Sequence, residues 1–171
     1  MPTSCNDLRL MAFDVDGVLT DGRLYYSDQG VELKAYHAQD GRAMKLLQKA
    51  GITLALITGR NTPAVANRAR DLGIDIVLQG ILDKRTAMGE LLAARGLDFS
   101  QAGYMGDDVQ DIKILAACGF SAAPADAHPL VKDHVAYVST LGGGHGAVRE
   151  VCEHILAAQG RLDALFASYL P

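Results

Sequence analysis

The chain has 171 residues, of which 49% are hydrophobic and 21% are charged, and its formal net charge is −4 at pH 7. This length suits one domain spanning residues 1–171, and this composition predicts a folded protein with a buried core. The acidic balance and the lack of a long Lys/Arg run argue against nucleic acid as a partner, because binding to a phosphate backbone requires a basic face.

The sequence also bears on where the protein works. Its first residues show no basic segment followed by an apolar stretch, and no run approaches the ~20 apolar residues of a membrane span. The three cysteines are odd in number and share no metal-ligand spacing, which indicates reduced thiols. We therefore expect a cytoplasmic protein without a membrane partner.

Short apolar runs alternate with helical patterns along the chain. Repeating strand–helix units with continuously apolar strands predict an α/β fold, a doubly wound and mostly parallel sheet of Rossmann-like type. Such sheets bind ligands beyond the carboxyl ends of their strands, where the strand order reverses. In chain order the predicted strands cover residues 8–15, 52–58, 74–80, 102–106 and 120–124, and the predicted helices cover residues 40–51, 63–73, 83–96, 108–119 and 145–160.

One segment interrupts this alternation. Two strand-like runs flank a Ser-Asp-Gln-Gly turn and predict a β-hairpin at about residues 23–36. An isolated hairpin would leave its apolar side chains exposed, so we expect a second copy of the chain to cover it. The hairpin and one helix leave no room for an inserted cap domain before the second parallel strand.

Acidic residues follow two of the predicted strands. Asp14 and Asp16 lie where the first strand ends, and Asp107, Asp108 and Asp111 come after the fourth. A turn or a helix cap would explain one aspartate but not the whole set. We assign Asp108 as the N-cap of the following helix. Carboxylates that converge at one edge of a sheet repel one another unless a hard cation neutralises them. The pattern therefore predicts a Mg²⁺ site.

The other strand ends carry groups that bind anions. Thr58, Gly59 and Arg60 follow the second parallel strand, and Lys84 begins the helix after the third. Each signal is weak alone, because Thr-Gly-Arg also starts helices and most lysines are solvated. Together a hydroxyl, a free backbone N–H and an ammonium group predict a phosphate-binding site.

The segments DVDGVLT, ITGR, Lys84 and GDDVQD together resemble the four ordered motifs of the haloacid dehalogenase superfamily. Over roughly residues 8–160 the chain is similar to the 3-deoxy-D-manno-octulosonate 8-phosphate phosphatases. This resemblance implies a homotetrameric phosphatase that removes the phosphate of an eight-carbon acidic sugar in lipopolysaccharide biosynthesis. A phosphatase for a nine-carbon sugar acid 9-phosphate and a non-catalytic regulatory module stay open as alternatives.

The same resemblance implies a role for each site residue. Asp14 is expected to attack phosphorus and form an aspartyl phosphate. Asp16 is expected to protonate the leaving sugar oxygen and then to take a proton from the water that hydrolyses the intermediate. Mg²⁺ is expected to be held by Asp14, the backbone carbonyl of Asp16, and Asp107. Thr58, Gly59 and Lys84 are expected to bind the phosphoryl oxygens, and Arg60 to bind the sugar carboxylate. Asp111 is expected to orient Lys84 or a metal-bound water.

Two features depart from the family pattern. Ala43 occupies the place of the second glycine in the family's Asp-Gly-x-Gly segment, which puts a close backbone approach there in doubt. The tail, residues 161–171, has no clear match, although its apolar residues recur on one face of a short helix. That face either packs on the chain's own core or reaches a neighbouring subunit and helps to cover its site.

Overall fold

The computed structural model describes residues 5–170. In this part of the chain six parallel strands form one sheet in the order β5-β4-β1-β6-β7-β8. Their bounds are β1 Leu10–Phe13, β4 Thr53–Ile57, β5 Ile76–Leu78, β6 Ala102–Met105, β7 Phe120–Ala123 and β8 Tyr137–Val138. The predicted doubly wound α/β fold is confirmed.

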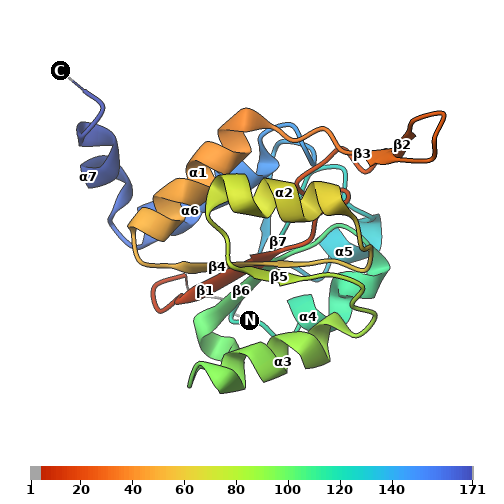
Figure 1. Cartoon of the computed structure of the whole chain (residues 1–171). Coiled ribbons are helices and arrows are strands. Elements are labelled where there is room, and N and C mark those ends of the chain that lie inside the picture. The colour runs from red at the N-terminus through yellow and green to blue at the C-terminus, as the bar shows by residue number, and fades with distance from the viewer. Residues whose placement is uncertain (1–4, 171) are drawn as a thin grey trace.

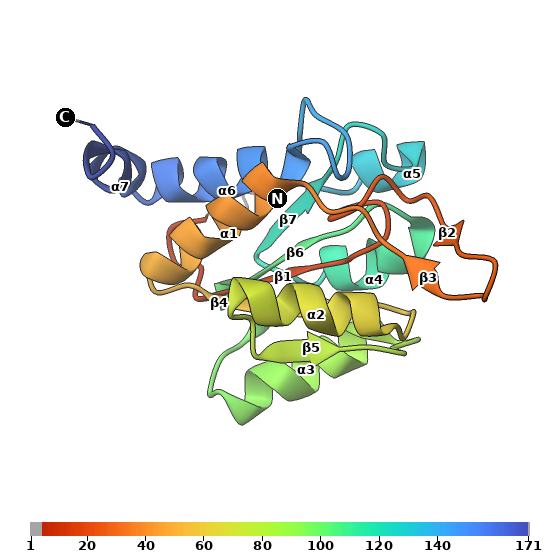
Figure 2. The same ribbon diagram turned by 45° about the horizontal axis from the view of Figure 1, so that its top comes forward.

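Helices cover both faces of the sheet (Figure 1). One layer holds α1 Ala38–Lys49, α2 Pro63–Leu72 and α6 Ala147–Ala158, and α1 and α6 lie side by side (Figure 2). The other layer holds α3 Lys84–Ala94, α4 Ile112–Leu115 and α5 Pro129–Lys132. Both faces of β1 are buried, Met11 and Phe13 against the first layer and Leu10 and Ala12 against the second. This two-sided burial explains why the strand is continuously apolar.

The chain builds the sheet outward from β1, first through β4 and β5 and then through β6 and β7 on the other side. The strand order therefore reverses between β1 and β6, which are neighbours. Ligands of doubly wound sheets bind in the crevice beyond the strand ends at this point. Asp14 follows β1 and Asp107 follows β6 closely, so the fold brings both aspartates to this position.

The hairpin is present but has little regular structure. Its strands are β2 Tyr25–Tyr26 and β3 Glu32–Leu33, with Gly30 at positive φ in the turn. The side chains predicted to be uncovered are exposed: Tyr25, Tyr26, Val31 and Leu33. Between β1 and β4 the chain forms only this hairpin and α1, and between β5 and α3 only residues 79–83, so neither segment holds a cap domain.

Several predicted boundaries are wrong. The helix predicted for residues 108–119 is a 3₁₀ turn, η2 Val109–Asp111, followed by the short α4. Another 3₁₀ turn, η1 Phe99–Gln101, precedes β6, and the prediction missed α5 and β8. Among residues 5–170, no helix combines the length and apolar character needed to cross a membrane.

The tail forms α7, Leu162–Ala167, and packs on the chain's own core. Leu162, Leu165 and Phe166 contact the apolar cluster beneath α1 and α6. The guanidinium carbon of Arg42 lies over the ring of Tyr169, 5.2 Å from the ring centre. Figure 1 places α7 at one end of the molecule and the hairpin at the other, so this tail lies far from its own chain's hairpin.

Candidate active site

Asp14 is held in place on both of its carboxylate oxygens. Its backbone N–H donates to the carbonyl of Met105, which continues the β1–β6 pairing beyond the strands. Its Oδ1 accepts a hydrogen bond of 2.7 Å from the Val15 amide, and its Oδ2 accepts one of 2.5 Å from Lys84 Nζ. The residue is only 3% exposed. Both backbone and side chain are therefore fixed at the strand end.

Lys84 lies beneath Asp14 in a buried network. Its ammonium donates to Asp14, to Asp111 Oδ1 at 2.7 Å and to the hydroxyl of Tyr104 at 3.1 Å. The Tyr104 hydroxyl donates to Asp111 Oδ1 and lies 3.4 Å from the carbonyl of Ile57. A buried tyrosine needs a partner for its hydroxyl, and here that partner belongs to the site. Tyr104 was not among the site residues predicted from the sequence.

Asp111 has no lone pair left for a further ligand. Its Oδ1 accepts from Lys84 and Tyr104, and its Oδ2 accepts from the amides of Asp107 at 3.1 Å and Asp108 at 3.3 Å. A carboxylate offers roughly four lone-pair sites, and these contacts use all of them. Gly106 makes the arrangement possible, because a Cβ there would lie 2.6 Å from Asp111 Oδ2.

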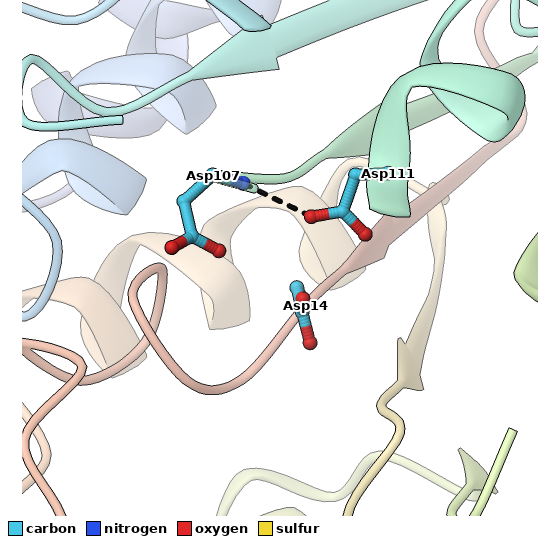
Figure 3. Close-up of side chains that lie close together, drawn as sticks. All are labelled: Asp14, Asp107 and Asp111. Atoms are coloured by element: carbon cyan, nitrogen blue, oxygen red, sulfur yellow. Dashed lines mark hydrogen bonds between the residues drawn. The ribbon is translucent and has the colours of Figure 1, made fainter. Parts of the chain in front are cut away.

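Asp107 lies beside Asp14 and Asp111 (Figure 3). Carboxylate oxygens of these three residues all fall within 4.8 Å of one another. Burial raises the pKa of Asp107 to about 8, and the charges of Asp14 and Asp111 add to the rise. Its backbone is fixed by the amide of His128, which donates to the Asp107 carbonyl at 2.8 Å. Asp108 caps the following 3₁₀ turn through the Val109 amide, as expected.

The cluster carries more negative than positive charge. Burial raises the pKa of Asp14 to about 7, Lys84 opposes the rise and Asp111 adds to it. Burial alone would lower the pKa of Lys84, but Asp14 and Asp111 outweigh it and raise that pKa. Three carboxylates, those of Asp14, Asp107 and Asp111, therefore lie close together beside a single ammonium group. A hard divalent cation with oxygen ligands fits this excess charge.

Gly17 brings the first loop against Asp107. Its φ is +82°, and a Cβ there would lie 2.0 Å from Asp107 Oδ2. The loop is organised by Thr20, whose Oγ1 lies 3.4 Å from the amide of Gly17 and 3.2 Å from that of Gly22. Gly143 supports the loop from outside, because a Cβ there would meet the Gly17 carbonyl at 1.9 Å. These residues were not predicted from the sequence, although DGVLTDG and GGGHG contain the glycines that such close packing requires.

The expected phosphate-binding residues end neighbouring strands. Thr58 is 1% exposed and follows β4, which pairs with β1, and its amide donates to Leu78. Gly59 is exposed, and a Cβ there would make only ordinary contact, 3.6 Å from the Ile81 carbonyl. Arg60 instead turns to the hairpin. Its Nη2 donates to Glu32 Oε2 at 2.6 Å and to the Tyr26 hydroxyl at 2.9 Å.

Asp16 lies apart from the Lys84 network and contacts the hairpin. Its Oδ1 accepts a hydrogen bond from Lys34 Nζ, and its Oδ2 lies 3.9 Å from Arg60 Nε. The first strand end thus presents two carboxylates in different surroundings, Asp14 in the buried network and Asp16 at the hairpin base. Lys34 was not among the site residues predicted from the sequence. Ala43 is 1% exposed in the core, and the close approach in that segment is made at Gly41 by Arg68.

Comparison with known proteins supports the resemblance to the haloacid dehalogenase superfamily. Residues 74–149 match the model of the haloacid dehalogenase-like hydrolases. The 3-deoxy-D-manno-octulosonate 8-phosphate phosphatase of Yersinia pestis is 45% identical over 92% of this chain and 84% of its own length. The Haemophilus influenzae phosphatase of the same name is 42% identical over 94% of this chain and 89% of its own length.

A solved structure matches nearly the whole chain. The Moraxella catarrhalis 3-deoxy-D-manno-octulosonate 8-phosphate phosphatase, solved with magnesium ion, phosphate ion and a KDO molecule, superposes with a TM-score of 0.95. It is 41% identical, and the match covers 97% of this chain and 95% of that one. On these grounds the chain belongs to the 3-deoxy-D-manno-octulosonate 8-phosphate phosphatase family of haloacid dehalogenase-like hydrolases.

Proposed function

We propose that this protein is a Mg²⁺-dependent phosphatase that hydrolyses 3-deoxy-D-manno-octulosonate 8-phosphate to the free sugar acid and phosphate. The observation that carries the proposal is the fixed Asp14 carboxylate, hydrogen-bonded to Val15 and Lys84 at the point where the strand order reverses. The names and coverage of the relatives support the substrate. The product is a precursor for lipopolysaccharide.

Asp14 is the proposed nucleophile. One of its carboxylate oxygens attacks phosphorus in line with the P–O bond to the sugar, and an aspartyl phosphate forms as that bond breaks. This divides one difficult displacement into two easier ones. The Val15 amide and Lys84 restrict the carboxylate to one orientation, which lowers the entropy lost on reaching the reactive geometry.

Asp16 is the proposed proton donor and acceptor. In the first step its carboxyl group gives a proton to the departing sugar oxygen. In the second step its carboxylate takes a proton from the water that attacks the aspartyl phosphate, and phosphate leaves. Its position outside the Lys84 network separates this role from that of Asp14.

Asp14, Asp107 and the backbone carbonyl of Asp16 would hold Mg²⁺, and Asp111 would support Lys84 and the backbone of Asp107 from behind. When bound, the ion supplies positive charge to the phosphoryl oxygens. Lys84, Thr58 and Gly59 are proposed to bind those oxygens as well. The half-exposed guanidinium of Arg60 is proposed to recognise the sugar carboxylate.

We further propose that the protein works as a homotetramer in the cytoplasm, with the hairpins packed together. The exposed Tyr25, Tyr26, Val31 and Leu33 support an interface, because such side chains are usually covered. The three buried, free cysteines are compatible with a reducing compartment. Sedimentation of the purified protein would measure the assembly directly.

The function is tested by measuring phosphate release from eight-carbon and nine-carbon sugar acid phosphates, with Mg²⁺ and with chelator. We expect a preference for the eight-carbon substrate, dependence on Mg²⁺, and loss of activity in Asp14→Asn. Asp75→Asn is the matched control, since Asp75 is exposed before β5 at the opposite end of the sheet. Full activity of Asp14→Asn or a preference for the nine-carbon substrate would contradict the proposal.

A further inference from the structure

Lys34 is a buried cation at the base of the hairpin. Its side chain is 1% exposed, a rare state for lysine unless the charge is paired. Its Nζ donates to Asp16 Oδ1 and lies 2.7 Å from Glu32 Oε1. Glu32 and Lys34 are two residues apart at β3, so their side chains project from the same face. The hairpin therefore holds the lysine against the proposed proton donor.

Glu32 connects two cations. Its Oε1 lies beside Lys34 Nζ, and its Oε2 accepts a hydrogen bond of 2.6 Å from Arg60 Nη2. Arg60 also donates to Tyr26 on β2, so both hairpin strands take part. Because Arg60 follows β4, this network connects the hairpin to the parallel sheet. It thereby limits where Lys34 can place its ammonium group.

The two oxygens of Asp16 differ in their surroundings. Oδ1 is held by Lys34, whereas Oδ2 is buried without a hydrogen-bond partner, 3.9 Å from Arg60 Nε. A carboxyl group that transfers a proton through one oxygen is best oriented by an anchor on the other. Lys34 provides such an anchor and leaves Oδ2 available for the proton.

We propose that Lys34 is a positioning residue that orients Asp16 for proton transfer to the leaving sugar oxygen, and that Glu32 holds Lys34 in place. The inference rests on the proposed function, in which Asp16 is the proton donor. As the P–O bond breaks, the proton moves from Asp16 to the sugar oxygen, and Lys34 keeps all of its protons. The hairpin is then part of the active site of its own chain.

A purely structural ion pair is the competing explanation. Such a pair would hold the hairpin in place, and its loss would slow the reaction of every substrate to the same extent. A positioning role differs, because it matters only where the leaving group needs a proton. An alkoxide leaving group needs one, whereas the more stable nitrophenolate leaves without it.

The test compares Lys34→Met with the wild type on 3-deoxy-D-manno-octulosonate 8-phosphate and on p-nitrophenyl phosphate, at saturating Mg²⁺. The quantity is kcat/KM, which covers the steps up to leaving-group departure and not the later hydrolysis of the aspartyl phosphate. We expect a loss of about 100-fold for the sugar phosphate and of less than about threefold for the aryl phosphate, within the range of general acid catalysis. The ratio of the two is independent of the folded fraction.

Three variants complete the experiment. Lys34→Arg keeps a cation and should recover part of the loss, and Glu32→Gln should show a smaller loss of the same selectivity. Lys45→Met is the control, since Lys45 is exposed on α1, and its activity should match the wild type. Equal losses on both substrates, or no loss, in Lys34→Met would overturn the inference.

The proposed function can fail separately from this inference. If the wild type did not hydrolyse the eight-carbon sugar phosphate, the substrate assignment would be wrong. The comparison would then use whichever primary alkyl phosphate the wild type hydrolyses, since its leaving group also needs a proton. The selectivity of Lys34→Met between alkyl and aryl phosphates would still decide the role of Lys34.

Discussion

Replacing Gly17 with alanine tests whether Asp107 needs its observed position. Gly17 has φ +82°, where an alanine is strained by roughly 1–2 kcal/mol. The new Cβ would lie 2.0 Å from Asp107 Oδ2, so the carboxylate would have to retreat by about 1.4 Å to reach ordinary contact at 3.4 Å. Because Asp107 is a proposed Mg²⁺ ligand, we expect the Mg²⁺ concentration for half-maximal activity to rise about 10–100-fold, the range for disturbed metal sites.

Gly51→Ala separates backbone strain from the contact with Asp107. Gly51 has φ +84°, and a Cβ there meets nothing within 4 Å. Backbone strain should lower the Tm of both variants by roughly 2–8 °C for a chain of this size, and Gly17→Ala should lose at least as much as Gly51→Ala, because of its added contact with Asp107. Only Gly17→Ala should change the Mg²⁺ dependence of phosphate release. If its Mg²⁺ titration matched that of Gly51→Ala, the placement of Asp107 in the metal site would be wrong.

Two further predictions concern pH and the tail. Because the folded pKa values of Asp14 and Asp107, about 7 and 8, lie above the usual carboxyl value, the metal-free folded state binds extra protons and should lose stability as pH rises from about 5 to 8. Thermal melting in chelator should show this fall, and added Mg²⁺ should raise Tm more at pH 8 than at pH 6; equal effects would contradict it. Deleting residues 161–171 should lower Tm, because Leu162 and Phe166 leave the core, and should leave kcat unchanged. An altered kcat with an unchanged Tm would instead favour the tail as a cover for a neighbouring subunit's site.

The strand ends of this fold can be predicted from the sequence because the sequence signals for these strands are local. Continuously apolar segments predicted the parallel strands, and parallel strands place their carboxyl ends at one edge. That rule alone brings Asp14, Thr58 and Asp107 near one another before any contact is known. The order of the strands then decides which of them are neighbours.

The helix predicted at residues 108–119 shows where a local signal is overridden. Its apolar spacing is helical, yet Asp111 turns back to accept hydrogen bonds from the amides of Asp107 and Asp108. This contact tightens the first turn into a 3₁₀ helix, Val109–Asp111, so the α-helix begins only at Ile112. The Lys34 contact with Asp16 was likewise missed, because it depends on where the hairpin folds back.

The buried charges of this site weaken the fold and serve the chemistry. A buried ion pair adds little stability over an apolar replacement, since both charges lose their hydration. Here Lys84 compensates Asp14 and Asp111, but Asp107 adds another carboxylate whose pKa burial raises to about 8. The excess negative charge can be relieved by protonation or by a cation. Because a proton on Asp14 would remove the nucleophile, only the cation both stabilises the site and leaves it ready to react.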